Sequence, residues 1–134
     1  LDQPQILKKG SDITIVSMGY MTNEAIKSNN ILKSYGIKCE IIDMCVMSPL
    51  SLTKVFSSVK KTKHLLVLDT STSICSLSSE ILSQIFRSCF NDLKSFSTVK
   101  NDVLIIQSTY NCSARICCIA KNHNLFHSSF KSSI

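Results

Sequence analysis

Extended and helical segments alternate along this chain, and this order constrains its fold more than any other feature of the sequence. The expected strands, which are rich in β-branched and aliphatic residues, are residues 12–18, 38–44, 64–69 and 103–106. The expected helices are residues 23–35, 52–62 and 77–90, with a weaker helix over residues 113–121. Strands and helices that alternate with short connections predict an α/β fold. We expect a three-layer, doubly wound, mostly parallel sheet of about five strands with helices on both faces.

The ends of the first helix are marked by two residues with known capping preferences. Thr22 is a candidate N-cap, and Gly36 is expected to be the left-handed residue that follows the helix. The core-facing stripe of this helix is expected to contain Ala25, Leu32 and Tyr35, with Ile31 beside them.

The second helix follows a proline that interrupts the chain after the second strand. The residue before Pro49 avoids the helical region, so an extended turn is expected there. Ser51 is a possible cap. The apolar spacing of the helix, which predicts an amphipathic face, is carried by Leu52, Val55, Phe56 and Val59.

A length of 134 residues is typical of one domain. We expect residues 1–134 to form a single domain with a linker or lead-in segment over residues 1–10 and a loosely held tail over residues 122–134. Because the sequence does not begin with Met, we expect it to be a fragment or a processed product.

The formal net charge of +6 does not by itself indicate nucleic-acid binding. The densest basic stretch surrounds an expected helix end, where lysines complement the helix dipole, and it has no aromatic platform. No apolar run approaches the length of roughly 20 residues that spans a bilayer. We therefore expect neither a nucleic-acid nor a membrane partner.

The cysteines and histidines do not have the spacing of a metal site. Seven cysteines are present, mostly single and within apolar segments, as is typical of buried free thiols in a reducing compartment. His123 and His127 are four residues apart but lack a third ligand nearby, so no metal is expected.

In a doubly wound sheet, ligands bind outside the carboxyl ends of the strands, and two acidic residues lie at those ends. Asp43 and Asp69 could form a carboxylate pair, which can hold Mg²⁺ or divide acid and base roles. The commoner role of a strand-end aspartate is to cap a loop or the next helix, and we favour it. With three glycines and no phosphate-binding or nucleophile motif, no catalytic residue is expected within this chain.

Over roughly residues 5–70, a set of residues follows the order and spacing of a known fold motif. They are Gly10, Gly19, Gly36, Asp43, Pro49, Leu50 and Asp69. In this first half the sequence resembles the C-terminal domain of transketolase-like thiamine diphosphate enzymes, most closely the beta subunit of pyruvate or branched-chain 2-oxo acid dehydrogenases. The second half departs from the family pattern, because residues 70–76 lack the usual glycine pair and residues 109–112 replace a proline-rich segment.

The resemblance implies an assembly domain of a 2-oxo acid dehydrogenase, the enzyme that decarboxylates a 2-oxo acid oxidatively and transfers the acyl group to lipoyl groups. In that family the other domains hold thiamine diphosphate and magnesium, so no cofactor is expected here and the isolated domain is expected to be inactive. The implied partners are the alpha subunit, a second beta subunit and the lipoyl acyltransferase core. Glu80 and Asp92 are candidate residues for contact with a basic partner. The implied compartment is the bacterial cytoplasm, the mitochondrial matrix or a plastid.

Two alternatives remain open from the sequence. The first is the C-terminal domain of a deoxyxylulose-phosphate synthase or of transketolase itself. The second is a stand-alone flavodoxin-like module, such as a receiver domain, for which Asp69 would be the phosphorylated residue. Residues 17–20 supply none of the acidic residues that a receiver needs at the end of its first strand.

Overall fold

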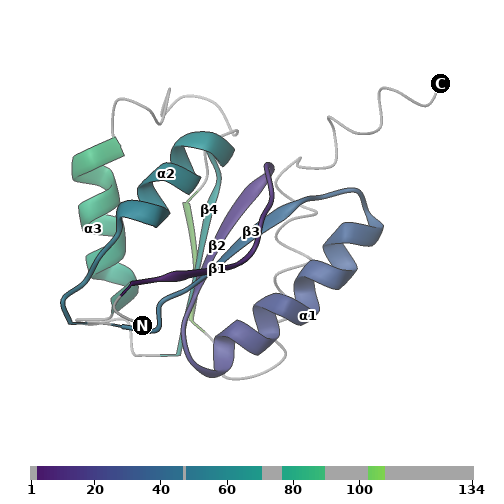
Figure 1. Cartoon of the computed structure of the whole chain (residues 1–134), viewed down its shortest axis with the longest axis horizontal. Coiled ribbons are helices and arrows are strands. Elements are labelled where there is room, and N and C mark those ends of the chain that lie inside the picture. Colours follow the sequence, from purple (N-terminus) through teal and green to yellow (C-terminus); the bar gives the residue numbers. More distant parts are fainter. Residues whose placement is uncertain (1–2, 47, 71–76, 90–102, 108–134) are drawn as a thin grey trace.

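The computed structural model describes residues 3–46, 48–70, 77–89 and 103–107 (Figure 1). The elements are, in chain order, β1 (Gln5–Lys8), β2 (Ile13–Ser17), α1 (Tyr20–Ser34), β3 (Cys39–Asp43), α2 (Thr53–Thr62), β4 (Leu65–Asp69), α3 (Leu77–Cys89) and β5 (Val103–Gln107). The expected helix over residues 113–121, the loop over residues 71–76, the tail over residues 122–134 and the His123–His127 pair lie outside the described residues.

The five strands form one sheet in the order β1-β3-β2-β4-β5. β2, β3, β4 and β5 run parallel, and β1 pairs antiparallel with β3 at one edge. Helix α1 lies on one face of this sheet, and α2 and α3 lie on the other (Figure 1). The expected α/β fold with helices on both faces of a mostly parallel sheet is therefore confirmed.

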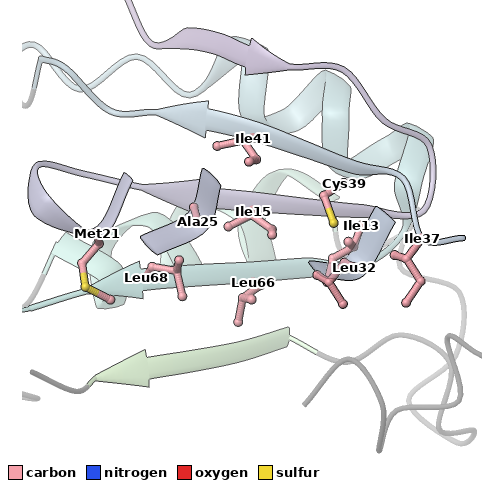
Figure 2. Close-up of a cluster of buried hydrophobic side chains, with 10 residues drawn as sticks. All are labelled: Ile13, Ile15, Met21, Ala25, Leu32, Ile37, Cys39, Ile41, Leu66 and Leu68. Carbon is pink, nitrogen blue, oxygen red and sulfur yellow. The ribbon is translucent and has the colours of Figure 1, made fainter. Parts of the chain in front are cut away.

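The two faces of the sheet are both apolar, because neighbouring residues of the central strands point to opposite sides. On the α1 side, the side chains come from three strands, from the helix and from the turn after it, as Figure 2 shows. This cluster consists of Ile13, Ile15, Met21, Ala25, Leu32, Ile37, Cys39, Ile41, Leu66 and Leu68. The alternate strand residues face α2 and α3, in a cluster of Val16, Ile42, Met44, Leu52, Val55, Val59, Leu65, Val67, Ile81 and Ile85.

The beginning of α1 and its buried face differ from the sequence-based expectation. The helix begins at Tyr20, with Gly19 as the N-cap at φ +57°, so the assignment of Thr22 as the cap is wrong. The predicted core positions Ile31 and Tyr35 are exposed, at 43% and 45%. The buried stripe of α1 contains Met21, Ala25, Ser28 and Leu32, which are spaced three or four residues apart. Ile31 and Tyr35 lie beside this stripe and not on it.

Helix α2 confirms the predicted apolar face and corrects the predicted cap. Leu52, Val55 and Val59 are buried and Phe56 is partly buried against them. The N-cap residue is Leu52, without a side-chain hydrogen bond, so Ser51 is not the cap. Within the described residues, neither α2 nor any other helix is long and apolar enough to cross a membrane.

The segment expected to be a linker over residues 1–10 contains β1 and a close backbone contact. Gly10 lies against β3, where an added Cβ atom would be 2.3 Å from the carbonyl carbon of Cys39 and 2.4 Å from the oxygen of Lys38. A side chain at this position would therefore push β1 away from β3.

We predict that Gly10→Ala lowers the free energy of unfolding by about 3 kcal/mol, because the new methyl group must displace backbone atoms. Urea denaturation followed by circular dichroism measures the change. Gly36→Ala is the matched control, since its Cβ would meet no atom within 4 Å and only its φ of +80° resists the substitution. It should cost about 1 kcal/mol. Equal losses in the two variants would contradict the close approach at Gly10.

Candidate functional site

At the carboxyl ends of β2 and β3, three polar side chains bond to one another. The Ser17 hydroxyl donates to Thr22 Oγ1 at 3.2 Å, and the Thr22 hydroxyl donates to Asp43 Oδ1 at 2.9 Å. The backbone N–H of Met44 also donates to the Ser17 carbonyl at 2.8 Å. These contacts tie the first turn of α1 to the ends of two strands.

Asp69, at the end of β4, accepts a hydrogen bond from the next helix. Its Oδ2 accepts from the backbone N–H of Ser78 at 3.1 Å, and the residue is 2% exposed. This is the capping role favoured from the sequence. Since β2 lies between β3 and β4, Asp43 and Asp69 are separated by two strand spacings, roughly 10 Å. The alternative of a directly paired carboxylate site is therefore wrong.

The switch point of this sheet lies between β2 and β4, because the helices that follow these strands cover opposite faces. At this switch point, Gly19 and Tyr20 follow the end of β2, and Thr70 follows the end of β4. Tyr20 is 66% exposed. The expected loop over residues 71–76 is outside the described residues. Among the residues described, no group of three or more His, Cys, Asp or Glu could hold a metal ion.

The opposite, amino end of the sheet holds a buried carboxylate that the sequence reasoning missed. Glu40 of β3 accepts hydrogen bonds from Lys61 of α2 and, at 3.3 Å, from the backbone N–H of Gly10. Its side chain is 5% exposed, whereas that of Lys61 is 50% exposed. A charged residue within the apolar run Cys39–Ile42 is the signal that could have identified it.

The surroundings of Glu40 alter its acidity. Burial of the carboxyl group favours its neutral form, but hydrogen bonds from Lys61, Gly10 and Ser58, with the positive charge of Lys61, outweigh burial and hold the pKa of Glu40 below its usual range. Ser58 belongs to a second polar contact, in which Thr14 Oγ1 lies 2.7 Å from both Ser58 Oγ and Thr62 Oγ1. Together these bonds fasten α2 to β2 and β3.

A shallow hollow of about 290 Å³ lies beside this network, between β1 and α2. Its lining residues are Ile6, Glu40, Thr53, Lys54, Ser57, Ser58 and Lys61. Lys54 Nζ donates to the carbonyl of Pro4 at 2.9 Å, so this lysine also joins α2 to the segment before β1.

The other residues singled out from the sequence are distributed over the fold. Gly36 follows α1 with φ +80°, the left-handed conformation predicted for it. Pro49 is exposed, and Leu50 packs partly buried against the cluster beneath α2 and α3. Glu80 is exposed on α3, where Gln84 donates to it at 2.8 Å. Asp92 lies outside the described residues.

The four parallel strands, counted from β2, have the order 2-1-3-4, which is also the beginning of the flavodoxin-like order. Strand order alone thus does not separate a flavodoxin-like module from the other hypotheses. The model of the family "Transketolase, C-terminal domain" matches residues 2–97. The chain belongs to the transketolase C-terminal domain family.

Known members of this family that resemble the chain are much longer than it. The beta subunit of acetoin:2,6-dichlorophenolindophenol oxidoreductase from Cupriavidus necator is 33% identical over 92 residues, which are 69% of this chain and 27% of that protein. The beta subunit of the pyruvate dehydrogenase E1 component from Rickettsia felis is 31% identical over 91 residues, 68% of this chain and 28% of that subunit. The Porphyra purpurea E1 beta subunit is 26% identical over 93% of this chain and 38% of its own length. The chain therefore spans about a quarter to two fifths of these relatives.

Solved structures with similar folds share little sequence with the chain. A split-gene transketolase, described as an inactive beta4 tetramer, has a TM-score of 0.66 and 18% identity, over 97% of this chain and 40% of that one. The 2-oxoglutarate:ferredoxin oxidoreductase from Magnetococcus marinus has a TM-score of 0.60 and 11% identity, over 92% of this chain and 20% of that one. At these identities, the likeness establishes the transketolase C-terminal fold.

We predict that Glu40→Gln lowers the free energy of unfolding by about 1–3 kcal/mol at pH 7, because it removes a buried acceptor of charge-assisted hydrogen bonds. The folded-state pKa of Glu40 is lowered, so the contribution of the carboxylate is complete above about pH 4.5 and is lost as the pH falls through the folded pKa. Urea denaturation at several pH values from 7 to 3 measures the difference between the two proteins.

The exposed Glu80 provides the matched control. Glu80→Gln should change the free energy of unfolding by less than about 0.5 kcal/mol at every pH. A constant difference between wild type and Glu40→Gln across the acid range would be incompatible with an ionised Glu40 in the folded state.

Proposed function

We propose that this chain is the C-terminal assembly domain of a thiamine-diphosphate-dependent 2-oxo acid dehydrogenase beta subunit and is not catalytic by itself. The observation that carries the proposal is the family match over residues 2–97 together with relatives that are named as beta subunits of pyruvate dehydrogenase E1 and of the acetoin oxidoreductase. The chain corresponds to only about a quarter of two of these subunits, so most of each relative lies outside it.

The described residues do not fit a site for thiamine diphosphate and its magnesium ion. Asp43 and Asp69 are each bonded within the domain, to Thr22 and to the backbone of Ser78. No cluster of three candidate metal ligands occurs in the part of the chain that is described. We propose that other parts of the parent enzyme hold the cofactor and supply its chemistry, while this domain stabilises the subunit contacts.

The exposed apolar side chains of the described residues support an assembly role. They are Ile6, Leu7, Tyr20, Ile31, Tyr35 and Phe86, on β1, α3 and along α1. Ile31 and Tyr35 lie one helical turn apart at the end of α1, and Tyr20 lies on the same side at its start, roughly 17–22 Å away along the axis. An exposed apolar pair such as Ile31 and Tyr35 is a surface that a partner can cover.

The proposed partners are a dehydrogenase alpha subunit, a second beta subunit and a lipoyl acyltransferase core. We propose a bacterial cytoplasm, a mitochondrial matrix or a plastid as the compartment. Relatives include E1 beta subunits from bacteria and the mitochondrial subunit of Ascaris suum. The free thiols of Cys39 and Cys45 are compatible with a reducing compartment.

If other parts of the parent enzyme hold the cofactor, the chain by itself should not bind thiamine diphosphate in the presence of Mg²⁺. Isothermal titration calorimetry of the 134-residue chain should give no binding heat up to millimolar cofactor. Pyruvate dehydrogenase E1 from Rickettsia felis, alpha and beta subunits together, is the positive control. Saturable binding of one cofactor per chain would mean that the domain has a cofactor site of its own.

The assembly role predicts that the chain associates with itself when the rest of the enzyme is absent. Light scattering over a dilution series should give a mass above 14.9 kDa at high concentration that falls toward this value on dilution. The double variant Ile31→Ser/Tyr35→Ser should shift the series toward monomer, whereas Lys27→Gln on the same helix should not. A mass of 14.9 kDa at all concentrations would count against the proposed interface.

A further inference from the structure

Basic side chains gather at the amino ends of the parallel strands. Each helix runs from the carboxyl end of one strand to the amino end of the next, and each has a basic residue in its last turn. The exposed cations at the amino end of the sheet are Lys8, Lys9, Lys33, Lys38, Lys60, Lys61, Lys63 and Arg87. We call these residues the amino-edge basic surface.

In the described part of the chain, two acidic residues near this surface, Asp12 and Glu40, are bonded within the domain. Asp12 accepts from the backbone N–H of Lys38 at 2.7 Å and from the Ser11 hydroxyl at 3.0 Å. Glu40 is bonded to Lys61 and to Gly10. Within the described residues, the exposed side chains of Lys8, Lys9, Lys38 and Lys63 are left without a carboxylate partner.

Helix dipoles explain only part of this arrangement. A cation in the last turn of a helix is stabilised by about 0.3–1 kcal/mol, and Lys33, Lys60 and Arg87 have such positions. Lys9 and Lys38 belong to no helix. Their positive charges lie near the others without a helix end to compensate them.

Backbone contacts bring these lysines to one place. The N–H groups of Ser11 and Asp12 donate to the Lys38 carbonyl at 3.1 and 3.0 Å, and the Thr14 N–H donates to the His64 carbonyl at 2.9 Å. The segments that carry Lys9, Lys38 and Lys63 therefore lie at the starts of adjacent strands, within roughly 10 Å of one another.

We infer that the amino-edge basic surface binds an extended acidic segment of a partner protein. Positive charge selects an anionic partner, and the formal net charge of +6 disfavours a second copy of this chain at the same place. Among the described acidic residues of a second copy, Asp69 and Glu24 are buried, at 2% and 7% exposure, and the exposed Glu80 accepts a hydrogen bond from Gln84.

A polypeptide fits this surface better than a nucleic acid because β1 is an edge strand. It pairs only with β3 in the sheet, and all four of its residues are exposed. An extended peptide can pair with the outer backbone groups of β1 next to Lys8 and Lys9 and place an apolar side chain in the hollow beside Ile6. A nucleic acid has no backbone N–H and C=O groups to pair in this way. The inference goes beyond the proposed dehydrogenase role and does not depend on it.

A labelled ten-residue peptide of alternating Glu and Val tests the inference by fluorescence anisotropy with the full 134-residue chain at low and physiological salt. The double variant Lys9→Gln/Lys63→Gln should weaken binding about threefold to tenfold, the effect of two exposed ion pairs. Lys27→Glu on α1 lowers the net charge by the same two units away from this surface and from the hollow beside Ile6, and it should change binding less than about twofold.

Three results would overturn the inference. They are the absence of peptide binding at low salt, an equal loss of affinity in Lys9→Gln/Lys63→Gln and in Lys27→Glu, and tighter binding of a single-stranded oligonucleotide of equal charge than of the peptide. Hydrogen exchange of the backbone amides over Gln5–Lys8 tests the strand-pairing step. We expect slower exchange when the Glu-Val peptide is added, and unchanged exchange would show that β1 is not the docking edge.

Discussion

The strands β2, β3 and β4 are apolar on both faces, and the rest of the structure follows from this constraint. A sheet of this kind must be covered on both sides, so the chain needs helices that lie on opposite faces. The crossover from β3 to β4 passes β2 on the face opposite α1, and this crossover defines the switch point next to Gly19. The position of a candidate site is thus a consequence of how the core is buried.

Within this frame, hydrogen bonds at the two ends of the strands have different effects. At the carboxyl end, Thr22 and Asp69 connect strand ends to the first turns of helices. At the amino end, Glu40 and Lys61 connect the middle layer to α2, with Gly10 drawn in from the segment after β1. Polar groups that could support chemistry in another protein are here used to position the layers.

The sequence predicted the parts of the fold that depend on hydrophobic periodicity. The central strands and the apolar face of α2 were predicted because Val55 and Val59 repeat with the helical period in a segment bounded by Pro49 and Lys63. The edge strand β1 was not predicted, because its four residues are exposed and therefore show no apolar pattern. Its place in the sheet depends on backbone pairing with β3. The burial of Glu40 was not predicted either, because it depends on a contact with Lys61, a residue of another element.

The candidate site was only partly predictable for a similar reason. A strand-end position shows where Asp43 and Asp69 lie along the chain but not which donor each one meets. The donor to Asp43 is Thr22, which the sequence pattern suggested as a helix cap and the structure places inside the first turn of α1. Capping preferences describe single helices, whereas this hydroxyl is placed by the packing of a helix on two strands.

The irregularity in β1 decides which layer of the domain is faced by the side chains on either side of it. Ile6 pairs with Ile42 and Lys8 pairs with Ile41, so one residue, Leu7, is accommodated between two consecutive positions of β3. Ile42 belongs to the cluster under α2 and Ile41 to the cluster under α1, which means that the irregularity lets Ile6 and Lys8 serve opposite layers. Without the irregularity, Leu7 would pair with Ile41 and Lys8 with Glu40, which would turn Lys8 to the other face of the sheet.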